Sequence, residues 1–200
     1  MRAGHTDAVT RLIPTMVGPM LAEATATGVS RVVRAGHGPD GEPARRPAGG
    51  GSGGRAGSGV DAGAGVGPGA DGAAGRHLDR LADQLDAYFA GALREFDVPV
   101  DWAAAGVDEG FSREVYREIR SVPYGDTASY GQISIDAGRP RNARRVGRLC
   151  SLVPVPFLIP VHRITRADGG LGACPEFRRG LLAHEQRNLH SPEPVAIDPV

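Results

Sequence analysis

Hydrophobic and polar residues alternate near the start of the chain and recur at helical spacing further on. Residues 20–33 alternate around Gly28, a pattern that predicts a β-hairpin. A later apolar stripe predicts one amphipathic helix over about 77–95. Its members are Leu78, Leu81, Leu85, Tyr88, Phe89 and Leu93. Residues 36–75 lie between these segments and contain 16 glycines but only two large apolar residues, Val60 and Val66. Such a segment cannot bury enough surface to offset its ordering entropy, so we expect a disordered insertion in a small domain.

Three further helices are predicted after residue 110. The apolar stripe that starts at Phe111 ends at Pro123 and Gly125, which indicates a helix between them. Asp126 or Thr127 could cap a second helix, which carries Tyr130, Ile133 and Ile135 and is closed by Gly138 and Pro140. A third helix covers residues 142–150. Two short helices joined by a tight turn, the second of them basic, form a helix-turn-helix pattern.

The charge distribution supports a nucleic-acid partner. The chain has a formal net charge of zero, and all of its 23 basic residues are arginine. Residues 111–190 nevertheless hold 13 arginines against 7 acidic residues, a net charge of +6. Five of these arginines lie within ten residues that contain no acid: Arg139, Arg141, Arg144, Arg145 and Arg148. A solvated helix face would also explain them, but the helix-turn-helix spacing makes nucleic-acid binding the better explanation.

Several other classes of protein are excluded. No stretch approaches 18 apolar residues, so we expect no membrane span, and the first ten residues do not resemble a signal peptide. Two cysteines cannot form a disulfide framework. The six histidines are scattered, so we expect no metal site and no cofactor. A cytoplasmic monomer is the expectation.

The most specific string is Pro154-Val155-Pro156-Phe157-Leu158-Ile159-Pro160-Val161-His162-Arg163-Ile164. It resembles the active-site segment of the methylated-DNA–protein-cysteine methyltransferases, whose signature is Ile-Pro-Cys-His-Arg-Val. The likeness runs from Phe111 to about Gln186 and includes residues 129–132, 139–140, 143–147 and 181–185. It implies an α+β fold with a small ribonuclease-H-like α/β domain over 1–105 and a winged helix-turn-helix DNA-binding domain over 106–190. Residues 191–200 would form a flexible tail.

The resemblance also implies that the reacting residue is missing. Family members take an alkyl group from guanine onto a cysteine thiolate, a step that requires an activated anion. Val161 stands in that position, and His162 and Glu185 match the relay that would activate a thiol. Val153 replaces an asparagine that braces the site in the family. The loop at residues 173–176 lacks the family's Tyr-Ser pair.

The DNA-handling residues of the family have counterparts here. By resemblance, Tyr130 would drive rotation of the target nucleotide, and Arg144 would enter the base stack in its place. The other predicted DNA contacts are Ser112, Gly131, Arg139, Arg145, Arg148 and Ala167. Cys150, Ile164 and Cys174 are predicted at the pocket. In lacking the thiol, the chain resembles the alkyltransferase-like proteins. These proteins bind alkylated guanine in duplex DNA and pass it to nucleotide excision repair.

Two alternatives to a non-catalytic binding protein remain. Cys150 or Cys174 could accept the alkyl group instead, although a nucleophile at a different position rarely lies in line with the reacting carbon. The chain could also be a winged-helix DNA-binding regulator without preference for a lesion.

Overall fold

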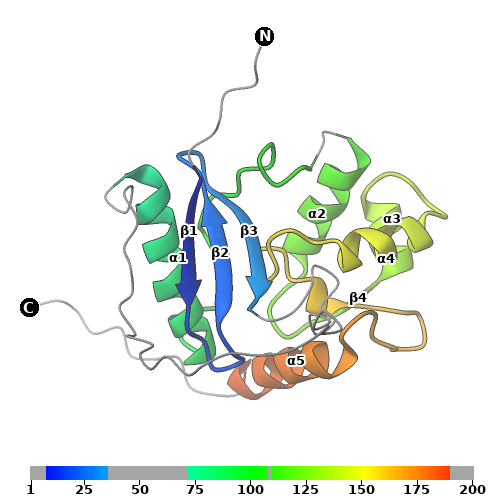
Figure 1. Cartoon of the computed structure of the whole chain (residues 1–200). Helices are drawn as coiled ribbons and strands as arrows, with labels where there is room; N and C mark the ends of the chain where they lie inside the picture. The colour runs from blue at the N-terminus through cyan, green and yellow to red at the C-terminus, as the bar shows by residue number, and fades with distance from the viewer. Residues whose placement is uncertain (1–7, 36–71, 108–109, 190–200) are drawn as a thin grey trace, which may run out of the picture.

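A three-stranded antiparallel sheet forms the N-terminal part of the molecule (Figure 1). The computed structural model describes residues 8–35, 72–107 and 110–189. The strands are β1 (Val9–Ile13), β2 (Met20–Ala24) and β3 (Val29–Arg34), in that order across the sheet. Pairing of β2 with β3 confirms the predicted hairpin. Strand β1 was not predicted, because five residues with two polar positions give a weak pattern on their own.

Gly28 lies at the end of the hairpin turn, where the segment of residues 98–101 passes very close to the backbone. The backbone amide of Val29 donates to the carbonyl of Pro99 at 2.8 Å, and that of Asp101 donates to the carbonyl of Val29 at 3.0 Å. A Cβ on Gly28 would lie 2.4 Å from the Pro99 carbonyl oxygen. Only glycine therefore permits this approach, which fixes residues 98–101 along the start of β3.

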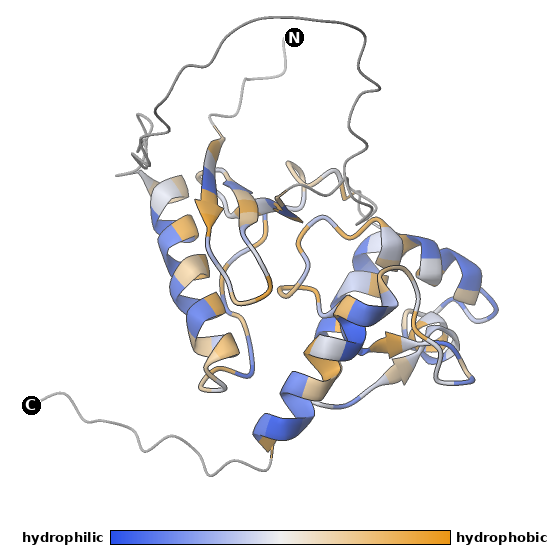
Figure 2. Ribbon diagram, turned by 60° about the horizontal axis from the view of Figure 1, so that its bottom comes forward, coloured by the Kyte–Doolittle hydropathy of each residue, from blue (hydrophilic) through white to orange (hydrophobic). Residues whose placement is uncertain are grey.

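Helix α1 (Ala73–Phe89) packs on the sheet. Leu78, Leu81, Leu85 and Tyr88 are fully buried, and Figure 2 shows hydrophilic residues along the outer side of the helix. The predicted bounds of 77–95 were wrong at both ends. The helix begins at Ala73, so the last residues of the predicted insertion (36–75) are helical; residues 36–71 lie outside the described part of the chain. It ends at Phe89 because Gly91 takes a left-handed backbone conformation with φ +79°.

The three helices predicted after residue 110 are present as α2 (Phe111–Ser121), α3 (Tyr130–Asp136) and α4 (Ala143–Ser151). The predicted cap of the second helix was wrong. Ser129 caps α3, because its hydroxyl accepts from the backbone amide of Gln132 at 3.0 Å. The turn between α3 and α4 is held by the buried Ser134, whose hydroxyl donates to the Arg139 carbonyl and accepts from the Asn142 amide.

The remaining elements among the described residues are a pair of short strands, a short helix and a longer C-terminal helix. Strand β4 (Ala128–Ser129) pairs in parallel with β5 (Ile164–Thr165), and the short helix η1 (Val161–Arg163) precedes β5. Helix α5 (Pro175–Leu189) runs beneath the sheet and the helices in Figure 1. Buried side chains from the N-terminal sheet with α1 and from the later helices form one continuous hydrophobic core. Within the described residues, no helix has the length and apolar character needed to cross a membrane. The predicted tail, residues 191–200, lies outside the described residues.

Candidate functional site

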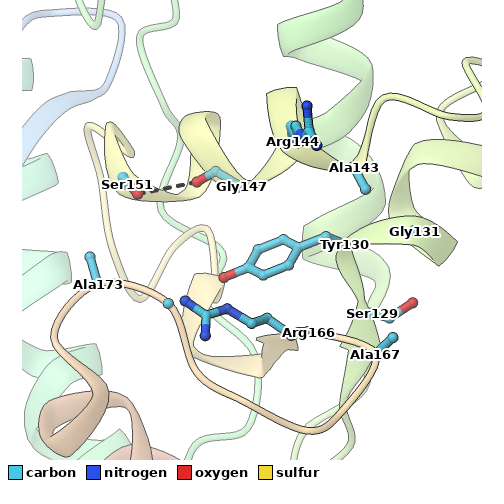
Figure 3. A pocket seen from close by; sticks show the side chains of 11 residues that line it. Ser129, Tyr130, Gly131, Ala143, Arg144, Gly147, Ser151, Arg166, Ala167 and Ala173 are labelled. Atoms are coloured by element: carbon cyan, nitrogen blue, oxygen red, sulfur yellow. Dashed lines mark hydrogen bonds between the residues drawn. The ribbon is translucent and has the colours of Figure 1, made fainter.

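A pocket of about 530 Å³ opens between α3, α4 and the loop that follows β5 (Figure 3). Figure 3 shows the phenol ring of Tyr130 crossing the pocket between α4, which carries Arg144, and the loop that carries Arg166. Its lining residues are Ser129, Tyr130, Gly131, Ala143, Arg144, Gly147, Ser151, Arg166, Ala167, Gly172 and Ala173. The structure thus brings four predicted contacts, Tyr130, Gly131, Arg144 and Ala167, to one concave site. Their role as contacts stays a prediction.

The other predicted contacts surround this pocket without lining it. Arg139, Arg145 and Arg148 are exposed on the turn and on α4, and Ser112 lies half-buried in the first turn of α2. The guanidinium of Arg145 stacks over the ring of Phe111, with 4.8 Å from its Cζ to the ring centroid. No acidic side chain among the described residues pairs with these arginines or with Arg144. The face around the pocket is therefore positively charged and uncompensated.

Arg166 is a pocket residue that the sequence analysis missed. It lies directly after β5, and Figure 3 shows its side chain extending below Tyr130 toward Ala173. It is exposed, and among the described residues it forms no ion pair. The sequence signal that could have found Arg166 is its position, two residues after Ile164, where the most specific string of the chain (residues 154–164) ends.

A buried carboxylate on α5 is hydrogen-bonded to four residues from three parts of the chain. Glu185 on α5 is completely buried. Its Oε1 accepts from the Tyr88 hydroxyl at 2.8 Å, and lies 2.7 Å from His162 Nε2. Arg163 donates to both carboxylate oxygens at 3.0–3.3 Å, and the Gly125 amide donates to Oε2 at 2.8 Å. The predicted pairing of His162 with Glu185 is present in the structure. The other three donors, Tyr88, Gly125 and Arg163, were not predicted.

These contacts decide the charge states of the cluster. Burial by itself would raise the pKa of Glu185, but the hydrogen bonds from His162 and Arg163, the charge of Arg163 and, once the imidazole is protonated in acid, the charge of His162 outweigh it and lower the pKa to about 2. Burial lowers the pKa of His162, although Glu185 opposes that shift. Burial and the nearby Glu185 raise the pKa of the Tyr88 hydroxyl. At neutral pH the cluster therefore holds an ionised Glu185, a charged Arg163 and a neutral imidazole.

We expect stability to fall as the pH drops below about 6.5. Both His162 and Glu185 have folded-state pKa values below their ordinary values of 6.5 and 4.5, so the unfolded chain binds protons first and acid favours unfolding. The contribution of His162 is lost below about 6.5, and that of Glu185 between about 4.5 and 2. Melting temperatures at pH 7.5, 5.5 and 3.5 measure this. A melting temperature that stays constant over this range would contradict the charge states above.

Val161 stands at the start of this cluster and carries no group that the imidazole could deprotonate. Its side chain is buried, with 7% of the residue exposed, and its carbonyl accepts from Arg178 Nη1 at 3.0 Å. The two cysteines differ from each other. Cys150 is buried in α4, where burial raises the pKa of its thiol to about 12, an effect that the charge of Arg178 only partly offsets. Cys174 is half-buried and precedes α5 with a left-handed backbone, φ +53°.

Comparison with known proteins identifies the relatives of this chain. Residues 110–190 match the family model "6-O-methylguanine DNA methyltransferase, DNA binding domain". A methylated-DNA–protein-cysteine methyltransferase of Mycolicibacterium paratuberculosis is 39% identical over 118 residues, which cover 58% of this chain and 68% of that protein. The chain belongs to this methyltransferase family.

Solved structures of the family extend the likeness to the whole chain. The Mycobacterium tuberculosis O6-methylguanine methyltransferase is 26% identical and superposes with a TM-score of 0.65, covering 95% of this chain and 98% of that one. A second structure, of Mycobacterium tuberculosis OGT in complex with DNA, is also 26% identical, with a TM-score of 0.64 over 90% of this chain and 93% of that one. The α+β fold expected from the sequence is therefore that of the family.

The family's chemistry requires a thiol, and neither cysteine of this member lines the pocket. Ile164, the third residue predicted there, is fully buried in β5 and is also absent from the lining. Arg178 links Cys150 to the pocket residue Tyr130, because its guanidinium contacts both the Tyr130 hydroxyl and the Cys150 backbone carbonyl. The assignment of these three residues to the pocket stays a prediction. The described residues also contain no cluster of His, Cys, Asp or Glu suited to a metal ion.

Proposed function

We propose that this chain is a non-catalytic DNA-binding member of the family, which binds alkylated guanine that has rotated out of duplex DNA. The observation that carries the proposal is the side chain before His162. The relay from Glu185 to His162 is complete, yet Val161 offers it no nucleophile. Rotating a base out of the stack costs a few kcal/mol, and less for a poorly paired damaged base. A pocket without a nucleophile would therefore hold the lesion rather than repair it.

The arrangement of helices supports DNA as the partner. Helices α3 and α4 would act as the helix-turn-helix unit, with the β4–β5 pair and its loop as the wing. We further propose the division into a ribonuclease-H-like domain over 1–105 and a DNA-binding domain over 106–190. A related protein from Mycobacterium tuberculosis has been solved in complex with DNA. In the present chain, the arginines around the pocket form no ion pair with a described acidic residue. The bound lesion would then pass, from a monomeric protein, to nucleotide excision repair.

The mass of the intact protein tests the absence of transfer. After incubation with a duplex that contains O6-methylguanine, we expect no gain of one methyl group, while binding to that duplex exceeds binding to the matched undamaged duplex. A methyl group found on Cys150 or Cys174 would instead support an active transferase that uses another thiol. Equal binding to both duplexes would support a DNA-binding regulator without lesion preference.

The chemistry of Cys150 argues against transfer of the methyl group to its thiol. A thiol with a pKa of about 12 is ionised in roughly one molecule in 10⁵ at neutral pH. Its side chain is also buried, with 1% of the residue exposed. The thiolate that a transfer step requires is therefore scarce and inaccessible at this position.

Two arginines on α4 should separate affinity from lesion preference. Arg148→Ala removes an exposed charge outside the pocket, so binding should weaken equally for damaged and undamaged duplexes, and the log–log salt slope should fall by about one unit. Arg144→Ala removes a pocket residue placed to fill the vacated stack, so the preference for the lesion should fall by roughly tenfold. Competition titrations at two salt concentrations measure both effects. Identical losses of preference in the two variants would contradict the assignment of Arg144.

A further inference from the structure

Arg178 places a buried positive charge against the pocket residue Tyr130. It lies near the start of α5, and only 5% of the residue is exposed. Its Nη1 donates to the Val161 carbonyl at 3.0 Å, and its Nη2 donates to the Cys150 carbonyl at 3.2 Å. A longer contact of 3.5 Å joins Nη1 to the Tyr130 hydroxyl. All three acceptors are neutral oxygen atoms.

This buried cation has no counter-ion among the described residues. The fully buried carboxylate of Glu185 is occupied by Tyr88, His162, Arg163 and Gly125. Arg163 is neutralised by that carboxylate, whereas Arg178 forms no ion pair. A charge removed from water is costly unless an opposite charge lies against it. The site around Arg178 is therefore one that an anion would complete.

The pocket leads to this charge. Tyr130 and Gly172 both line the pocket, and the Tyr130 hydroxyl contacts Arg178. A Cβ on Gly172 would lie 2.5 Å from the Tyr130 hydroxyl and 3.5 Å from Arg178 Nη1. The Tyr130 hydroxyl therefore fills the space between Gly172 and the guanidinium, and a ligand in the pocket reaches Arg178 when that hydroxyl is displaced. The contact of this hydroxyl with Nη1 is also the longest of the three, and thus the easiest to replace.

We propose that Arg178 makes the pocket select guanine adducts that end in a carboxylate over adducts with a neutral chain. The inference rests on the proposed function, and it names the class of lesion that the same pocket takes. A carboxylate that enters beside Gly172 would accept a charge-assisted hydrogen bond from Nη1 in place of the Tyr130 contact. It would also supply the charge that the protein does not. DNA phosphates are a separate matter, because they contact the exposed arginines outside the pocket.

Competition binding of the full chain to four matched duplexes tests the proposal. They carry guanine, O6-methylguanine, O6-(2-hydroxyethyl)guanine or O6-carboxymethylguanine at one position. The hydroxyethyl adduct is close in size to the carboxymethyl adduct but uncharged. We expect the carboxymethyl duplex to bind at least about tenfold more tightly than the hydroxyethyl duplex, the scale of one charge-assisted hydrogen bond.

Matched variants assign the effect to Arg178. Arg178→Gln keeps a donor for the backbone carbonyls but removes the charge, so the ratio should fall to near one. Arg179→Gln is the control, because Arg179 is exposed and pairs with Glu176 on the surface. It should leave the ratio unchanged. Arg166→Gln, which removes one of the two arginines that line the pocket, tests whether an exposed pocket charge reads the carboxylate instead, and the ratio should persist in it. If Arg178→Gln does not fold, the wild-type ratio and the Arg166 variant decide.

Each contrary outcome has its own meaning. If both adducts bind equally, and both better than guanine, the inference about Arg178 fails while the proposed function stands. If the ratio survives in Arg178→Gln, or is lost in Arg166→Gln, another residue reads the charge and the inference fails. If no adduct is preferred over guanine, the proposed function itself fails.

Discussion

Replacing Glu185 with glutamine is expected to destabilise the protein by about 3–5 kcal/mol, the largest effect of any single polar substitution proposed for this chain. The variant leaves the buried Arg163 without its counter-ion. It also replaces one carboxylate oxygen, an acceptor for Tyr88, His162 or Gly125, with an NH₂ group that can only donate. Urea unfolding at neutral pH measures the loss.

The control for this variant is Glu176→Gln at the start of the same helix. Glu176 is 84% exposed and pairs with Arg179 one turn away, so its loss should change stability by no more than about 0.5 kcal/mol. Similar free energies of unfolding for the two variants would show that the buried carboxylate is not the centre of the cluster. The Glu185 variant should also lose the part of the acid sensitivity that lies between about pH 4.5 and 2.

Replacing Val161 with cysteine is expected to restore only weak methyl transfer. The relay of His162 and Glu185 is already in place, so the new thiol would have a base beside it. Access is the difficulty, because Arg178 holds the carbonyl of residue 161 and stands between this position and Tyr130. Val153 also replaces the asparagine expected to brace the site. A misplacement of about 1 Å costs roughly a hundredfold in rate, so transfer should be that much slower than with a well-placed thiol.

Intact-mass time courses with an O6-methylguanine duplex follow this reaction, and peptide mapping locates the methyl group. Val161→Ser serves as the control, because a hydroxyl at the same position is a far weaker nucleophile at neutral pH. Rapid transfer of one methyl per chain would show that Arg178 and Val153 are no obstacle. A faster reaction in the double variant Val161→Cys, Arg178→Gln would identify Arg178 as the barrier.

The pattern of hydrophobic and polar residues along the chain predicted most of the secondary structure but only part of the site. The hairpin around Gly28 and the helices after residue 110 follow from alternation and from 3.6-residue spacing, which local sequence determines. Helix ends were less predictable: α1 stops at Phe89 because Gly91 adopts a left-handed conformation, although Leu93 continues the apolar stripe. Strand β1 is too short to be predicted from its own sequence, and it is defined by its pairing with β2.

The interior of the site depended on contacts that sequence spacing does not encode. The family resemblance implied the pair of His162 and Glu185, and the structure places His162 Nε2 2.7 Å from Glu185 Oε1. Nothing in the sequence pattern linked Tyr88 to a carboxylate 97 residues later. Arg178 was not among the residues singled out from the sequence, and the fold buries it against two backbone carbonyls.

Tyr88 gives the molecule a further property, the cooperativity of its unfolding. Its hydroxyl belongs to the Glu185 cluster, while its ring contacts Phe157 and Tyr124, so one residue of α1 is packed into the C-terminal half. Separating the halves would strip a donor from a buried anion and expose an aromatic layer at the same time. The sheet and the DNA-binding helices therefore cannot melt independently at low cost, and the two predicted domains should behave in solution as a single thermodynamic unit.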